Sequence, residues 1–171
     1  MLARNAKIQH AWRMNDETTP LRTYLVVYDG SAEARVALRF AARRAAKTQG
    51  RVEMLAIVEP AEFVQWGGVQ DALEEEAQLG AEAMLHQAAA EIADELGADP
   101  TMTVRQGEPV KAVRTLLEER PGTAALVLGA TIVGGPGPLV AYFAGAEAGV
   151  MPCPVMIVPG SLDDAALDRL S

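Results

Sequence analysis

The chain has 171 residues, the size of one ordinary domain with a short tail, and it is long enough to bury a substantial core. Half of the residues are hydrophobic and 22% are charged, a balance that is typical of a globular protein. The formal net charge of −8 argues against nucleic acid or an anionic lipid surface as the main partner, since both bind basic faces.

Three further features of the sequence bear on where the protein is located in the cell. The single cysteine, Cys153, cannot form an internal disulfide, which indicates a cytoplasmic protein. The most hydrophobic stretch, residues 138–158, is interrupted by a glutamate and two prolines and is no candidate for a membrane span. Residues 1–13 are basic but lack a hydrophobic core, so they are not a secretory signal. We expect residues 1–20 to be a flexible tail, with a transit-like peptide as the alternative and Met14 as a second candidate start.

Hydrophobic runs and helical patterns alternate along the chain. The first run ends at an Asp-Gly-Ser turn, where Ser31 is a good N-cap for a helix and Glu33 suits the positive end of the helix dipole. The predicted strands are residues 21–28, 51–58, 101–105, 123–128 and 155–158. The predicted helices are residues 31–49, 71–96, 109–120 and 139–150, with a short helix in 161–171 that Ser161 and Asp164 begin as a capping box.

This alternation predicts an α/β fold with a five-stranded parallel sheet and helices on both of its faces. The first, second and fourth strands are almost continuously hydrophobic, which suits burial on both sides. The alternating pattern of residues 101–105 indicates an edge strand. We expect one domain, residues 21–159, followed by a short helical tail at 160–171.

A candidate site lies at the carboxyl ends of the first and fourth strands. Ligands bind at this end of an open α/β sheet, where the strand order reverses. That rule places Asp29 near Gly129 and near the glycine-rich loop that follows it. Such a loop, leading into a helix, is the usual backbone cradle for a phosphate. Asp29 is equally suited to accept hydrogen bonds from a ribose or base and to cap its own turn.

Several separated motifs resemble the universal stress proteins. The opening strand and helix read VVYDGSAEARVALRFAARRAA, the second strand ends in IVEP, GEP precedes a helix, and the last strand reads PCPVMIVP. The resemblance runs in order over residues 21–159. It implies a Rossmann-like fold of the adenine nucleotide alpha-hydrolase type and a homodimer. It also implies ATP binding in a large branch of the family, with Asp29 and Ile57 at the positions that contact base and ribose.

The ATP-binding branch carries the motif G-x2-G-x9-G-[ST] after the fourth strand. In this chain the first glycine is Gly129, but Ile132 occupies the second glycine position. Ala141 and Tyr142 occupy the positions of the third glycine and the hydroxyl residue. The glycines that remain as displaced candidates for phosphate contacts are Gly134, Gly135 and Gly137.

These departures weaken a phosphate site. Ile132 has a branched Cβ where glycine would let the backbone approach a phosphate. Pro136 and Pro138 remove two N–H donors from the loop. Only Arg120 and Arg169 supply positive charge after residue 116. We therefore expect no tight ATP binding of the kind that the family resemblance implies.

The last predicted strand is a candidate dimer interface. Pro154 would be costly in a central strand, so this strand belongs at a sheet edge. An exposed hydrophobic edge is normally covered or paired, and a second copy across a two-fold axis does both. Cys153 would lie beside that interface and is best interpreted as a small buried hydrophobe. The predicted interface residues are Val155, Met156, Ile157 and Val158.

Other polar features have simpler interpretations. Four basic residues spaced four apart on the first helix favour a solvated face over a site for an acidic partner. Three consecutive glutamates in residues 74–76 point in different directions, and His10 and His86 are isolated, so we predict neither a metal site nor a catalytic triad. Trp66 would lie over the strand ends, contact a partner or pack onto the domain. The four basic residues are Arg35, Arg39, Arg43 and Lys47.

Two functional hypotheses follow. The first is a cytoplasmic, homodimeric stress-response protein that is not an enzyme, needs no cofactor and acts through contacts with other proteins, with a vestigial or altered nucleotide site. The alternative is a protein that binds ATP or AMP through Asp29 and the loop at 129–137, including as a slow ATPase.

Overall fold

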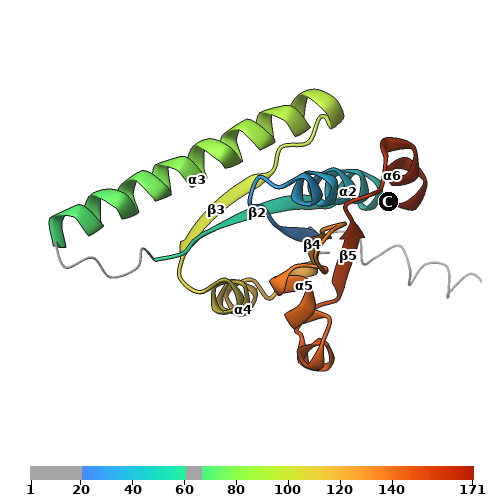
Figure 1. Cartoon of the computed structure of the whole chain (residues 1–171). Helices are drawn as coiled ribbons and strands as arrows, with labels where there is room; N and C mark the ends of the chain where they lie inside the picture. Colours follow the sequence, from blue (N-terminus) through green and yellow to red (C-terminus); the bar gives the residue numbers. More distant parts are fainter. Residues whose placement is uncertain (1–20, 61–66) are drawn as a thin grey trace, which may run out of the picture.

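A five-stranded parallel sheet forms the centre of the molecule (Figure 1). The computed structural model describes residues 21–60 and 67–171. The order of the strands is β3-β2-β1-β4-β5, and every neighbouring pair is parallel. This arrangement confirms the predicted α/β fold and places both β3 and β5 at edges. The strands are β1 (Thr23–Val27), β2 (Arg51–Val58), β3 (Thr101–Gln106), β4 (Thr123–Ala130) and β5 (Val155–Pro159).

Helices cover both faces of this sheet, as predicted (Figure 1). The helices on one face are α2 (Ala32–Thr48), α3 (Gly67–Leu96) and α6 (Asp164–Leu170). The other face carries α4 (Pro109–Glu119) and α5 (Pro138–Phe143), and the 3-10 helix η1 (Ala146–Val150) lies against α5. Within the described ranges, none of these helices combines the length and the hydrophobicity needed to cross a bilayer.

Successive residues of the central strands supply two separate cores. Val26 and Met54 point into the core under α2 and α3, while Leu25 and Leu55 point into the core under α4 and α5. All four are fully buried, as expected for parallel strands that are covered on both sides. The buried side chains of α2 are mostly alanines, so this helix can lie close to the sheet.

Two predicted helices differ from the observed ones. Residues 139–150 do not form one helix, because α5 ends at Phe143 and Gly145 is non-helical with φ −88° and ψ −136°. The tail helix begins after Asp163 rather than Ser161, since a turn from Pro159 to Leu162 comes first. The Asp163 carboxylate accepts the N–H of Ala166 at 2.8 Å and so caps α6.

The long helix α3 begins at Gly67, a few residues before the predicted start at residue 71. The predicted loop at 59–70 is correspondingly shorter. Trp66, His10 and the expected tail at residues 1–20 lie outside the described residues.

The basic face of α2 binds its own chain instead of being solvated throughout. Arg39 donates two hydrogen bonds to the Glu95 carboxylate of α3, at 3.0 and 2.7 Å. Arg43 donates to Asp168 and Asp164 of α6 at 2.6 and 3.0 Å, and its side chain is only 13% exposed. These pairs attach α3 and α6 to α2. The sequence could not indicate them, because the partners are 56 to 125 residues away.

Candidate functional site

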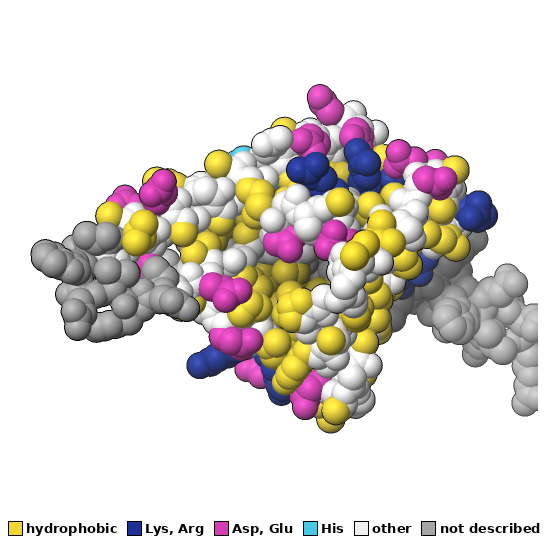
Figure 2. Space-filling model, viewed as in Figure 1, with side chains coloured by type: hydrophobic (Ala, Val, Ile, Leu, Met, Phe, Trp, Pro, Cys, Tyr) yellow, Lys and Arg dark blue, Asp and Glu magenta, His cyan; other side chains and the backbone are white. Residues whose placement is uncertain are grey.

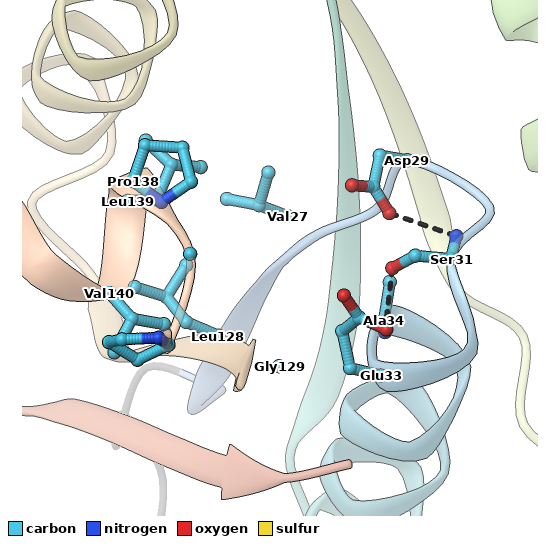
Figure 3. Close-up of a pocket in the computed structure, with 12 residues that line it drawn as sticks. Val27, Asp29, Ser31, Glu33, Ala34, Leu128, Gly129, Pro138, Leu139 and Val140 are labelled. Carbon is cyan, nitrogen blue, oxygen red and sulfur yellow. Dashed lines mark hydrogen bonds between the residues drawn. The ribbon is translucent and has the colours of Figure 1, made fainter. Parts of the chain in front are cut away.

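A cavity of about 140 Å³ opens at the carboxyl ends of β1 and β4, where the strand order reverses (Figure 3). Polar residues of the β1–α2 turn form one wall, and the first turn of α5 forms the opposite wall (Figure 3). The sequence predicted a site at this place from the strand-order rule. The lining residues are Val27, Asp29, Ser31, Glu33, Ala34, Leu128, Gly129, Pro136, Gly137, Pro138, Leu139 and Val140.

Asp29 caps its own turn and also lines the cavity. One of its carboxylate oxygens, Oδ1, accepts the N–H of Ser31 at 2.9 Å. Ser31 is the N-cap of α2, and its Oγ accepts the N–H of Ala34 at 3.2 Å. Turn capping, one of the two roles considered for Asp29, is therefore present. Figure 3 shows the second carboxylate oxygen directed away from Ser31, on the side of the cavity.

Glu33 is the site residue that the sequence analysis missed. It lies in the first turn of α2, is half-buried, and lines the cavity beside Asp29 (Figure 3). None of the described residues donates a hydrogen bond to the Glu33 carboxylate or forms an ion pair with it. Its position two residues after the N-cap could have indicated a site residue, because the first turn of α2 lies where the strand order reverses.

Gly129 has a structural reason to be glycine. A Cβ atom at this position would lie 2.4 Å from the carbonyl oxygen of Glu33 and 3.0 Å from the N–H nitrogen of Ala34. The end of β4 therefore touches the backbone of the first turn of α2. The one glycine that matches the ATP motif is required by packing, whatever the cavity binds.

The remaining predicted site residues divide into two groups. Gly137 lines the cavity with φ +92° and is the N-cap of α5. Gly134 and Gly135 also have positive φ, at +82° and +99°, but they are exposed in the loop and do not line the cavity. Ile57 is half-buried against the core under α4 and α5 and does not line it either. The structure thus brings together Asp29, Gly129 and Gly137.

The side chains of Ile132 and Tyr142, which replace a glycine and the hydroxyl residue of the ATP motif, do not point into the cavity. Ile132 is 73% exposed in the loop. The ring of Tyr142 packs edge-on against Phe143, with 5.1 Å between the ring centroids. Its hydroxyl accepts a long hydrogen bond of 3.4 Å from Arg114. Neither side chain lines the cavity.

The cavity is acidic. Its ionisable lining residues are Asp29 and Glu33, and none of the described residues that line it is Lys or Arg. In Figure 2, acidic and hydrophobic side chains border the hollow between α2 and α5. Such a lining accepts hydrogen bonds from a ligand and repels phosphate groups. Over residues 21–60 and 67–171, no group of three or more His, Cys, Asp and Glu residues could hold a metal ion.

The outer edge of β5 carries backbone groups that pair with no other described strand. Leu126 of β4 donates its N–H to the carbonyl oxygen of Pro154 at 2.9 Å. Because the backbone groups of a strand alternate in direction, those of Val155 and Ile157 face away from β4. No strand of the described part of the chain pairs with that side. The Ile157 side chain is 43% exposed. Of the other predicted interface residues, Val155 and Met156 are half-buried and Val158 is buried.

Comparisons with known proteins agree with this architecture. A sequence model of the universal stress protein family matches residues 20–159. The universal stress protein UspA from Lactobacillus plantarum has a similar structure, with a TM-score of 0.69 at 20% identity over 82% of this chain and 99% of that one. The comparison with curated proteins found no match.

Two further similar structures contain nucleotides. A universal stress protein in complex with cAMP has a TM-score of 0.55 at 23% identity, over 82% of this chain and 98% of that one. The protein from Archaeoglobus fulgidus in complex with dAMP has a TM-score of 0.53 at 20% identity, over 80% and 96% of the two chains. At these identities the likeness shows the fold. Together with the family match across most of the chain, it establishes that the chain belongs to the universal stress protein family.

Proposed function

We propose that this chain is a cytoplasmic, homodimeric stress-response protein that is not an enzyme and acts through contacts with other proteins. The observation that carries the proposal is the outer edge of β5, where the backbone groups of Val155 and Ile157 pair with no strand in residues 21–60 and 67–171 and the Ile157 side chain is 43% exposed. A hydrophobic edge of this kind templates pairing with another strand. Antiparallel pairing with β5 of a second copy satisfies these groups and covers Ile157 around a two-fold axis.

The cavity supports an altered nucleotide site. The Asp29 and Glu33 carboxylates occupy one wall and would repel a triphosphate. Pro136 and Pro138, on the opposite side, have no N–H to donate to phosphate oxygens.

A second candidate function is binding of an adenine nucleotide by this cavity, including as a slow ATPase. It is favoured by the convergence of Asp29, Gly129 and Gly137 at the strand-order reversal. The complexes of similar structures with cAMP and dAMP also support it. Native mass spectrometry of freshly purified protein separates the two candidates, because one spectrum gives both the subunit count and the mass of any nucleotide that co-purifies.

The dimer is tested directly by Ile157→Asp. In a dimer paired through β5, this variant would bring two like charges to the paired edges and cover them, and both effects are unfavourable. We expect the wild-type protein to be a dimer by light scattering coupled to gel filtration, and the variant to be a monomer with an unchanged circular dichroism spectrum.

The matched control is Leu79→Asp. Leu79 is 59% exposed on α3, so the variant places the same charge on a hydrophobic surface residue away from β5. This control is expected to remain dimeric. A monomeric wild-type protein, or a dimer that persists in Ile157→Asp, contradicts the proposal.

A further inference from the structure

We propose that the cavity between β1, β4 and α5 selects an uncharged adenine nucleoside over its phosphate esters, and that Glu33 sets this preference. The inference rests on the second candidate function for the position of the site and for the adenine base. It goes beyond that function in naming a ligand class without phosphate and the residue that excludes phosphate.

The first argument is charge. The Asp29 and Glu33 carboxylates lie on the same wall, and no described lining residue carries a positive charge (Figure 3). A phosphate group in the cavity would therefore meet two like charges and no counter-charge. The repulsion between two like unit charges about 6 Å apart in water weakens binding about threefold at low salt. A doubly charged monophosphate facing one carboxylate consequently loses up to about tenfold.

The second argument is the supply of hydrogen-bond donors. A phosphate needs N–H groups, but the Ser31 N–H is bonded to Asp29 and the Ala34 N–H is bonded to the Ser31 hydroxyl. Pro136 and Pro138 on the far side have no N–H at all. Two N–H groups at the start of α2, where an anion would otherwise bind, are thus already bonded to side chains of the same turn.

The third argument is what the cavity does offer. The second oxygen of Asp29 and both oxygens of Glu33 are acceptors that have no hydrogen-bond donor among the described residues. A nucleoside has hydroxyl and amino groups that donate to such oxygens. Leu139 and Val140, on the opposite wall, supply a hydrophobic surface for a base or sugar. The lining therefore complements a neutral ligand that donates hydrogen bonds.

The test is a titration of the full-length, ¹⁵N-labelled protein, followed by NMR, with adenosine, AMP and ATP in the absence of magnesium. NMR is suitable because it detects weak binding and reports whether the resonances of Gly129 and Gly137 move. We expect adenosine to bind tightest and ATP weakest. Glu33→Gln keeps the size of the side chain and removes its charge, so it should raise the ratio of AMP affinity to adenosine affinity about 3- to 10-fold at low salt. The same variant should weaken adenosine binding itself, because Gln keeps only one acceptor oxygen and loses the charge-assisted hydrogen bond.

The control Glu76→Gln removes the same charge from an exposed position on α3 and should alter neither affinity. Raising the salt concentration should shrink the effect of Glu33→Gln on AMP binding.

AMP or ATP binding more tightly than adenosine to the wild-type protein would overturn the inference. So would a Glu33→Gln variant that changes adenosine and AMP binding equally. If none of the three ligands moves the cavity resonances, the inference is wrong, while the dimer proposal is judged separately by the subunit count.

Discussion

Replacing Gly129 by alanine tests whether packing or ligand binding requires this glycine. The new Cβ atom would lie 2.4 Å from the carbonyl oxygen of Glu33, whereas side-chain Cβ atoms stay at least 3.0 Å from such neighbours. The obstacle is the backbone of α2, which cannot swing aside as a side chain can. The end of β4 and the first turn of α2 must therefore separate, at the typical cost of overpacking, about 1–3 kcal/mol.

For a domain of this size, that cost lowers the melting temperature by about 2–12 °C. The assay is thermal unfolding by circular dichroism without any nucleotide, so that a loss of ligand cannot contribute. Gly122→Ala is the matched control, since a Cβ there has no atom within 4 Å and the residue has no positive φ. We expect this control to be neutral or to gain up to about 1 kcal/mol through the unfolded chain. If Gly129→Ala melts at the wild-type temperature, the packing explanation for this glycine is wrong.

Two further predictions concern the attachment of α6 and the single thiol. Arg43→Met should remove the hydrogen bonds to Asp164 and Asp168, lower stability by about 1 kcal/mol or less, and speed amide hydrogen exchange in α6. Arg35→Met, on an exposed residue of the same helix, should leave that exchange unchanged, and equal exchange in both variants would refute the role of Arg43. Burial raises the pKa of the Cys153 thiol, an effect that a backbone hydrogen bond with Leu126 partly offsets. Because a raised pKa leaves less thiolate at a given pH, alkylation of Cys153 should be slower in the folded than in the urea-unfolded protein from neutral pH up to about pH 9. Equal rates in the two states would contradict the assignment.

Local sequence signals predicted most of the elements because their causes are local. Ser31 was recognised as the N-cap of α2 from its residue type and place, and its hydroxyl does accept the N–H of Ala34. Pro154 identified the last strand as an edge strand, because proline cannot complete a central ladder, and β5 is at the edge. The break between α5 and η1 escaped this reasoning. A Cβ at Gly145 would lie 2.8 Å from the Ala141 carbonyl oxygen, a contact that arises only once the chain has turned there.

The candidate site could be placed from the sequence only as far as its end of the sheet. The strand-order rule brought Asp29 and Gly129 together correctly. It could not say which loop glycines reach the cavity, because Gly137 lines it while Gly134 and Gly135 do not. That outcome depends on the path of the loop between β4 and α5.

The sequence by itself determined the family, the alternation of strands and helices, and the loss of the glycine and hydroxyl positions of the ATP motif. These properties follow from residue type, period and spacing along the chain. Only the tertiary structure decided the character of the cavity. The close approach of β4 to α2 makes Gly129 a packing residue and places the Glu33 carboxylate in the cavity wall. Glu33 and Gly129 are far apart in the sequence, so their contact exists only when the sheet has assembled.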